Sequence, residues 1–326
     1  MAAATPPAAA GFPRSSNAAL TLGIITRSMF GRGHEAATDA VGAAIQVAQE
    51  RFAARVWAMS PDWVERLPTP GNLRFWRALA TLDAEVGRII AARLSTGDPG
   101  DDLLGMLLRA QGGETGGIDS RQVRDEVMTA FVAGHETSAA ALTWIWHLLG
   151  QHPEVAERVA DEATAVLDGR AAPGPDDLAR LPFTLAVIEE AMRLYAPVGW
   201  LARRVVAPDR VIGHKLPAGA IVLVSPYLMQ RDPRLWPDPE RFDPARFAPG
   251  APRRAPYSYF PFGGGPRACI GRHFAMTEMV VALATLAPRV RLHPASEGQV
   301  RPRLLVTLRP QGGLPMRIER RGTRNP

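Results

Sequence analysis

The chain has 326 residues, of which 46% are hydrophobic, and it can therefore bury a substantial core in one large or two smaller domains. Its formal net charge is +6, but the arginines that supply almost all of the positive charge are spread along the chain, so they do not indicate a nucleic-acid-binding protein. A single cysteine excludes an internal disulfide, and no apolar run approaches the roughly 20 residues of a membrane span.

The first third of the sequence predicts a tail followed by helices. Residues 1–18 are rich in Ala and Pro and lack the charged start and apolar core of a signal peptide, which predicts a disordered tail on a cytoplasmic protein. The segment that follows is mostly helical in pattern and carries no recognisable chemical motif. Helices are expected at 20–30, 37–58, 72–94 and 101–110.

A long helix is expected from Asp119 to Gly150, because a glycine pair breaks the chain before it and Asp119 to Gln122 has the pattern of a capping box. In its middle lies the polar segment Ala133-Gly-His-Glu-Thr-Ser138. Glycine and threonine are poor residues for a helix interior, and threonine can bond to the carbonyl one turn earlier, so a local kink is predicted. Taken alone, the segment is better explained as a polar surface patch or a threonine satisfied within the core.

Two helices and several short strands are expected next. The helices lie at 154–167 and 183–195. In the second, Glu190 and Arg193 share a helix face, which by itself indicates no more than a surface salt bridge. Apolar stretches flanked by turns predict strands at 203–206, 211–213, 220–225, 289–293, 304–309 and 314–318.

The single cysteine, Cys269, lies in the segment Phe262-Gly-Gly-Gly-Pro-Arg-Ala-Cys-Ile-Gly271, where four glycines and a proline predict a tight turn. Apolar residues recur at helical spacing after Gly271, so the thiol is expected where a loop enters a helix. A helix start stabilises a thiolate, and Arg267 adds a positive charge that can meet a carboxylate, which together suit an axial ligand of haem iron. The alternatives are a buried apolar cysteine and a phosphate-binding turn, although no GKS/GKT or GxGxxG pattern is present.

Two motifs resemble those of a known family. The spacing Phe-x-x-Gly-x-Arg-x-Cys-x-Gly is met by Phe262, Gly265, Arg267, Cys269 and Gly271, and it is similar to the cysteine-ligand signature of the cytochrome P-450 (haem-thiolate monooxygenase) family, soluble bacterial type. The segment Ala-Gly-x-Glu-Thr-Ser resembles the oxygen-activating helix of that family. The resemblance runs from about residue 20 to 321, with specific motifs from residue 133 onward.

The resemblance implies a mainly α (α+β) fold with small sheets, which binds haem b through Cys269 as the axial iron ligand. Other residues matched to haem contacts are Phe262, Gly265, Arg267 and Gly271 in the loop, Ala133 and Gly134 in the long helix, and Arg203, which would reach a propionate. Glu136 and Thr137 match an acid–alcohol pair that holds water and delivers protons to dioxygen. His135 is better explained by packing or a salt link than as an iron ligand.

The resemblance also covers the segment between the long helix and the cysteine. Glu190, Arg193 and Arg246 match a buried triad that holds the cysteine loop from beneath, a structural role and not a catalytic one. Gln230-Arg-Asp-Pro233 and Trp236-Pro-Asp-Pro239 continue the match.

The implied reaction is insertion of one dioxygen atom into an apolar organic substrate. Electrons would come from NAD(P)H through a ferredoxin- or flavodoxin-type donor and its reductase. The cysteine side is the docking face in this family, so Arg267, Arg272 and Arg289 are expected to attract an acidic donor. No nucleic-acid or membrane partner is expected.

The chain departs from the family in one respect, because it begins where the family's middle helices begin. The expected P-450 domain, residues 19–321, is therefore incomplete at its N-terminus and is expected to bind haem weakly, and residues 322–326 form a second disordered tail. Two alternatives stay open: a non-catalytic haem-binding remnant, and a reductase-independent peroxygenase or isomerase, which would not need Glu136 and Thr137 as a proton relay. A nucleic-acid binder is a more distant alternative.

Overall fold

The computed structural model describes residues 16–31, 38–58, 62–111, 117–295 and 298–322. The chain divides into two compact units, one made of residues 12–140 and one formed mainly by residues 141–326. The long helix α5 (Ser120–Gln151) contributes to both. Most of the two predicted tails lies outside the described residues, but α1 begins at Ser16, inside the segment predicted as the N-terminal tail.

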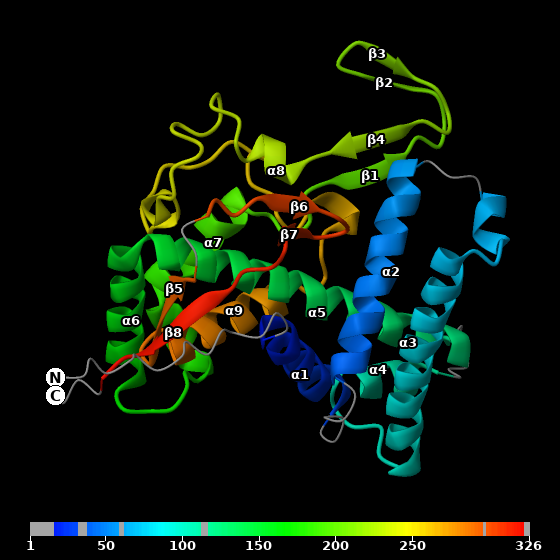
Figure 1. Cartoon of the computed structure of the whole chain (residues 1–326), viewed down its shortest axis with the longest axis horizontal. Coiled ribbons are helices and arrows are strands. Elements are labelled where there is room, and N and C mark those ends of the chain that lie inside the picture. Colours follow the sequence, from blue (N-terminus) through cyan, green and yellow to red (C-terminus); the bar gives the residue numbers. More distant parts are fainter. Residues whose placement is uncertain (1–15, 32–37, 59–61, 112–116, 296–297, 323–326) are drawn as a thin grey trace, which may run out of the picture. The chain divides into compact units, whose positions relative to one another are not determined.

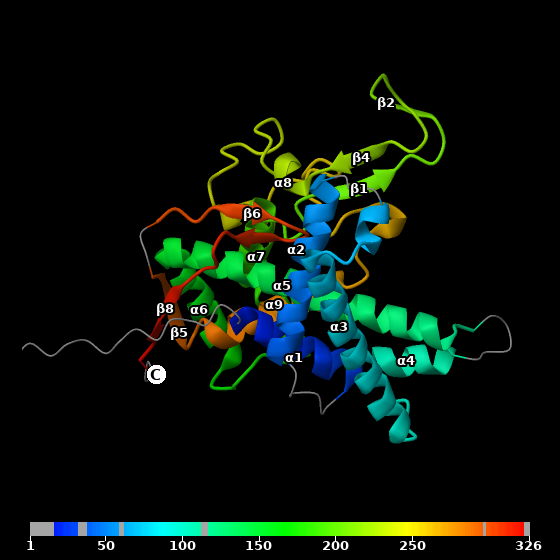
Figure 2. The ribbon, with the colours of Figure 1, turned by 45° about the vertical axis from the view of Figure 1, so that its right-hand side comes forward.

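The described part of the first unit is helical. It contains α1 (Ser16–Phe30), α2 (Thr38–Ala58), a 3-10 turn (Asp62–Arg66), α3 (Pro70–Ser95), α4 (Leu103–Ala110) and the first part of α5. Helices α2 and α3 pack side by side, as both ribbon views show (Figures 1 and 2). All four helices predicted before residue 112 are confirmed.

The starts of α3 and α5 follow local capping rules. The Thr69 hydroxyl accepts a hydrogen bond from the N–H of Asn72 at 3.2 Å. Before α5, the Asp119 carboxylate accepts the N–H of Gln122 at 2.7 Å, and the Gln122 side chain accepts the N–H of Asp119 at 2.9 Å. These bonds satisfy N–H groups that have no partner within the helix. The predicted capping box is therefore confirmed.

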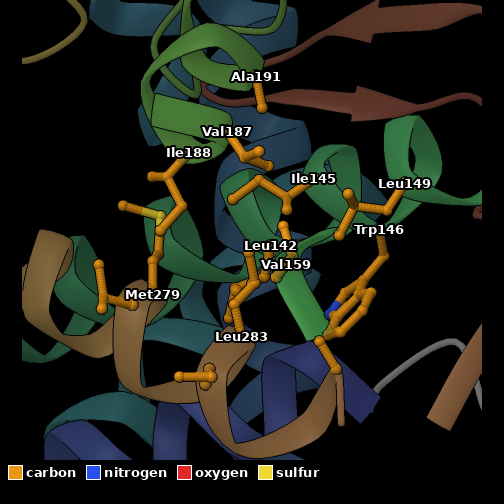
Figure 3. Packing of buried hydrophobic residues seen from close by; sticks show 14 of the residues in the cluster. Leu142, Ile145, Trp146, Leu149, Val159, Val187, Ile188, Ala191, Met279 and Leu283 are labelled. Carbon is orange, nitrogen blue, oxygen red and sulfur yellow. The ribbon is translucent and has the colours of Figure 1, made fainter. Parts of the chain in front are cut away.

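The second unit packs its helices around the second half of α5. It adds α6 (Pro153–Leu167), α7 (Pro182–Leu194), α8 (Pro226–Met229) and α9 (Arg272–Leu286), with 3-10 turns at Pro175–Arg180, Pro244–Phe247 and Gly265–Arg267. Figure 3 shows α5, α6, α7 and α9 meeting in one apolar cluster, in which Leu142, Ile145, Val159, Val187 and Leu283 are completely buried. Each Å² of apolar surface buried in this cluster contributes about 25 cal/mol to folding, and this contribution holds α7 and α9 against each other. Helix α7 carries Glu190 and Arg193 of the predicted triad, and α9 follows the cysteine.

The strands form small antiparallel pairs in the second unit. Strand β1 (Leu201–Arg204) pairs with β4 (Ile221–Val224), and β2 (Asp209–Val211) with β3 (His214–Leu216). Strand β5 (Val290–Pro294) pairs with β8 (Met316–Arg320), and β6 (Pro302–Leu304) with β7 (Leu308–Pro310). The predicted class, mainly α with small sheets, is confirmed. Among the described residues, no helix is both long and apolar enough to cross a bilayer.

Two of the six predicted strands were placed over turns. The stretch 211–213 contains the β2–β3 hairpin turn, where Ile212 and Gly213 have φ of +48° and +79°. The stretch 304–309 contains the turn between β6 and β7, closed by a 3.1 Å bond from the N–H of Leu305 to the carbonyl of Thr307. Isoleucine and leucine are atypical of such turns. The apolar composition of these two stretches therefore predicted strands at positions where the chain reverses direction between paired strands.

Candidate functional site

The cysteine segment forms a loop that is closed by its own backbone. The chain turns at Gly263 and Gly265, both with φ of +70°, a conformation that favours glycine. The N–H of Cys269 then donates to the carbonyl of Phe262 at 2.9 Å. Helix α9 begins directly afterwards, with Gly271 at its N-cap. The predicted placement of the cysteine, in a glycine-rich loop that enters a helix, is confirmed.

The loop has close neighbours within the second unit. A Cβ on Gly264 would lie 2.6 Å from Cε1 of Tyr257, so glycine lets the backbone lie close to that ring without displacing it. A Cβ on Gly263 would lie 3.6 Å from Cδ1 of Leu201. Strand β1, which begins at Leu201 and carries Arg203, therefore lies beside the loop.

The exposed donor atoms of the loop fit a haem. Cys269 is a free, exposed cysteine, and the side chain of Ile270 beside it is fully exposed. In the part of the chain that the structure describes, no group of three or more His, Cys, Asp or Glu side chains could hold a bare metal ion. A single thiolate therefore suits an iron whose other ligands come from a porphyrin. Arg267 and Arg203 are both exposed on this unit and can meet anionic groups such as propionates.

The structure brings the predicted triad together beneath α7. The side chains of Glu190 and Arg193 are completely buried, and Arg193 Nε and Nη2 donate to the two carboxylate oxygens of Glu190 at 2.7 and 2.9 Å. Glu190 also accepts the N–H of Asp243 at 2.9 Å. The Nε of Arg246 lies 3.5 Å from the same carboxylate. The carboxylate thus links α7 to the segment around residue 243.

Arg193 extends this link to main-chain carbonyls. Its remaining N–H groups donate to the carbonyl oxygens of Gln230, Pro239 and Arg241 at 2.8, 2.7 and 3.1 Å. Burial raises the pKa of Glu190, whereas the bonds from Arg193 and from the N–H of Asp243 stabilise its carboxylate. Removing Arg193 would leave the buried Glu190 with only the longer contact to Arg246, and removing Glu190 would leave the buried Arg193 without its carboxylate, so either change is strongly destabilising.

The second predicted constellation lies in the first unit, within the uninterrupted helix α5. The hydroxyl of Thr137 donates to the carbonyl of Ala133 at 2.6 Å, which is the bond one turn back that the sequence predicts. The hydroxyl oxygen keeps its lone pairs as acceptors for a further donor. Glu136, the next residue on the N-terminal side, is buried, with 7% of its surface exposed.

Gly134 and His135 serve packing within the first unit. A Cβ on Gly134 would overlap Cδ1 of Ile25 in α1, so the glycine lets α1 and α5 approach closely. His135 is 2% exposed, and its carbonyl accepts a bond from the hydroxyl of Thr21 at 2.9 Å. The same hydroxyl lies 3.2 Å from its Nδ1. His135 is therefore a packed, hydrogen-bonded residue, as the sequence predicts.

Comparison with known proteins gives the same assignment as the motifs. The family model described as "Cytochrome P450" matches residues 16–314. The chain belongs to the cytochrome P450 family. This P450 chain is 41% identical over 281 residues to cyclooctat-9-en-7-ol 5-monooxygenase of Streptomyces melanosporofaciens, and 39% identical over 250 residues to pentalenene oxygenase of Streptomyces avermitilis.

These matches cover most of the P450 chain but only part of its relatives. The two matches span 85% and 76% of this chain, and 60% and 55% of the two relatives. Among solved structures, the heme domain of cytochrome P450DA and the retinoic-acid-bound cyanobacterial CYP120A1 each align with a TM-score of 0.82 at 28% identity. Those alignments cover 95% and 94% of this chain and 68% of each neighbour. The family implies haem b as the cofactor.

One residue beside the P450 triad was not identified from the sequence as part of the site. Gln230 was considered only as the first letter of a matching stretch, yet its side chain is completely buried beside Arg193. A glutamine in a loop carries no periodic or spacing signal, because its partners lie far away in the sequence. Its side chain bonds to the backbone of Met192, Arg193 and Phe260.

Proposed function

We propose that this P450 chain is a haem-thiolate monooxygenase, which inserts one oxygen atom of O2 into an apolar organic substrate. The observation that carries the proposal is an exposed, free Cys269 in a backbone-closed loop at the start of α9. The match to one relative named as a monooxygenase and one named as an oxygenase supports it. Because the chain spans only part of those relatives, the activity is proposed here for the chain itself.

The residues of the second unit would bind and orient the cofactor. When bound, haem b supplies an iron centre that activates dioxygen. Cys269 would hold it from one face as a thiolate and donate electron density. Arg267 and Arg203 would pair with propionate groups through charge-assisted hydrogen bonds.

Glu136 and Thr137 would take part in proton transfer to dioxygen. The Thr137 hydroxyl donates its hydrogen bond to the carbonyl of Ala133, so its oxygen remains free to accept a hydrogen bond from water. Glu136 is buried next to this threonine, and its carboxyl group would exchange protons with the ordered water. Together they would order a water molecule and pass protons towards dioxygen.

The substrate class and the electron donor are also part of the proposal. The names of the two relatives denote an alkenol and an alkene, which supports a mainly apolar organic substrate. Electrons from NAD(P)H would arrive through an acidic ferredoxin or flavodoxin, attracted by Arg267 and Arg272, which are exposed on either side of Cys269. Arg289 would add to this attraction, with its guanidinium held by bonds to the carbonyls of Thr285 and Ala171.

The test combines an absorption spectrum of the haem-loaded chain with an analysis of the reaction product. The haem-loaded chain, reduced and exposed to carbon monoxide, is expected to show the thiolate-type absorption band. Cys269→Ser should lose that band, whereas Ala268→Ser, which places the same hydroxyl one exposed residue earlier, should keep it. Turnover of alkenes and alkenols under isotope-labelled O2, with NADPH, ferredoxin and reductase, should place one labelled oxygen atom in each product molecule.

Three other outcomes would contradict part of the proposal. An unchanged band in Cys269→Ser would exclude this thiolate as the ligand. A normal band without labelled product would favour a haem-binding chain without turnover. Product formed from hydrogen peroxide but not from O2 and reductant would favour a peroxygenase.

A further inference from the structure

Gln230 is a completely buried amide whose side chain forms hydrogen bonds at both ends. Its Nε2 donates to the carbonyls of Met192 and Arg193 at 3.0 and 3.1 Å, at the C-terminal end of α7. Its Oε1 accepts the backbone N–H of Phe260 at 2.9 Å. The side chain therefore connects the end of α7 to the segment that leads into the cysteine loop.

After Phe260, two main-chain hydrogen bonds shape the loop as far as the backbone of Cys269. The carbonyl of Phe260 accepts the N–H of Gly263 at 2.9 Å, which sets the first turn of the loop. The carbonyl of Phe262 accepts the N–H of Cys269 at 2.9 Å, which closes the loop. Phe260 thus takes part in the first turn of the loop, two residues before the carbonyl that holds the backbone of Cys269.

The residues before Phe260 are anchored differently. The indole N–H of Trp236 donates to the carbonyl of Ser258 at 3.2 Å. The hydroxyl of Tyr259 donates to the carbonyl of Glu189 in α7 at 3.1 Å, and burial raises the pKa of Tyr259 well above its ordinary value, so it stays a donor. These bonds hold a carbonyl and a side chain, whereas Gln230 holds the backbone N–H next to the loop.

We propose that Gln230 is a positioning residue for Cys269, which transmits the fixed geometry of α7 to the thiolate. The proposal rests on the proposed function, in which Cys269 binds haem iron. A ligand must be held within about 0.5 Å of its productive place, and supporting side chains with locked hydrogen bonds achieve this. Gln230 acts through Phe260 and does not touch the cofactor in this scheme.

The amide is suited to this role because it offers a donor and an acceptor in opposite directions. Gln230→Met keeps the length of the side chain and removes both functions, so the N–H of Phe260 and two carbonyls lose their partners. Gln230→Glu keeps an oxygen that can accept the N–H of Phe260 but replaces the donor that serves Met192 and Arg193. The two variants therefore separate the link to the loop from general loss of stability.

A matched control exists in the first unit. Asn72 is also a buried amide, whose Nδ2 donates to the carbonyls of Val64, Glu65 and Leu67 and whose Oδ1 accepts from Arg51. Asn72→Leu removes a comparable set of bonds without touching the cysteine loop. It should lower the free energy of unfolding about as much as Gln230→Met does.

The first readout is amide hydrogen exchange at Phe260, Gly263 and Cys269, measured in the chain with and without haem. Gln230→Met should speed exchange at these three amides by roughly tenfold or more, because the N–H of Phe260 loses its acceptor and the loop that contains the other two opens more readily. Gln230→Glu and Asn72→Leu should change it by less than about twofold, although both lower stability. The proposal is overturned if exchange in the loop follows global stability in all three variants, or is unaltered in Gln230→Met.

The second readout is the reduced, carbon-monoxide-bound spectrum. Gln230→Met should convert a larger fraction of the thiolate-type band to the thiol type than Asn72→Leu does, and Gln230→Glu should retain the wild-type ratio. Equal ratios in all variants would overturn the role of Gln230 in positioning the thiolate. If Gln230→Met does not fold, Gln230→Asn, which keeps the amide but is one methylene shorter, replaces it with the same expected direction.

The two proposals can fail separately. If the wild-type chain shows no thiolate-type band, the proposed function fails, and exchange at Phe260 still decides whether Gln230 holds the loop. If the band is present but does not respond to Gln230→Met, the haem assignment stands and the positioning role is lost.

Discussion

Gly134 in α5 faces Ile25 in α1 so closely that a Cβ on Gly134 would overlap Cδ1 of Ile25 and lie 3.0 Å from its Cγ1. Ile25 is completely buried, so its side chain has little room to move. The glycine in the Ala-Gly-x-Glu-Thr-Ser segment therefore has a packing role within the first unit, whatever it contributes to cofactor binding.

Gly134→Ala should destabilise the chain because the new methyl group must displace Ile25. Overpacking of this kind costs about 1–3 kcal/mol, and the higher helix propensity of alanine returns at most about 1 kcal/mol. Urea unfolding should show a net loss, and Ile25→Val should recover part of it in the double variant. Gly87→Ala in α3, where no atom lies within 4 Å of an added Cβ, is the control and should be neutral or stabilising. A stabilising Gly134→Ala would contradict the close approach.

Thr137→Ala should uncouple electron use from product formation. Without the hydroxyl, water beside Glu136 is less well ordered, so more of the electrons should end in hydrogen peroxide and water. The measurement is product formed per NAD(P)H consumed, which should fall several-fold while haem binding is unchanged. Thr129→Ala is a close control, because the Thr129 hydroxyl makes the same bond one turn back, to Asp125 at 2.8 Å, in the same helix. Equal coupling in both variants would remove Thr137 from the proton relay.

Glu157 should make stability depend on acid pH. Its carboxylate binds Arg291 Nε at 2.8 Å and Arg321 Nη1 at 2.6 Å, and these partners lower its pKa to about 2 from 4.5. Because the folded-state pKa is lowered, the stabilisation is present above about pH 4.5 and is lost as the pH falls towards 2. Glu157→Gln should lower the free energy of unfolding at pH 7 by about 1–2 kcal/mol, allowing for solvent screening.

The difference between Glu157→Gln and wild type should shrink as unfolding is measured at pH 4.5, 3.5 and 2.5. Glu154→Gln is the control, since Glu154 lies one turn earlier in α6 with 72% of its side chain exposed. A difference that stays constant with pH would show that the loss at pH 7 has another origin.

Electron transfer from an acidic donor should weaken as ionic strength rises. Exposed charges separated by more than about 10 Å are largely screened at 0.1 M salt, so the association rate should fall steeply over that range. Arg272→Gln should lower the association rate at low salt and flatten the salt dependence, whereas Arg74→Gln, an exposed arginine of α3 in the other unit, should change neither. Stopped-flow reduction is the measurement, and a rate insensitive to salt would argue against electrostatic docking.

Much of the helical structure could be predicted from the sequence because its signals are local. The capping pair Asp119 and Gln122 predicts the start of α5, and the apolar periodicity after Gly271 predicts α9. Each depends on residues within one or two turns of each other, and such interactions are already specified by the order of side chains.

The β2–β3 hairpin shows where local signals mislead. Ile212 adopts φ of +48° although β-branched residues disfavour that region, so its identity indicates a strand while its position requires a turn. The pairing of Asp209 with Leu216 and of Val211 with His214 places the reversal there. Register between strands is a property of the pair, which neither strand encodes alone.

By itself, the sequence determined the position of the cysteine loop, because Phe262, Gly265, Arg267, Cys269 and Gly271 lie within ten positions and their spacing is the motif. Only the tertiary structure revealed what holds that loop in place. The partners of the Gln230 side chain lie 30, 37 and 38 residues away, at Phe260, Arg193 and Met192. A buried amide bonds to whatever backbone groups the fold brings within about 3 Å of it, and separations of that size follow from the packing of α7 against the loop, which no local pattern specifies.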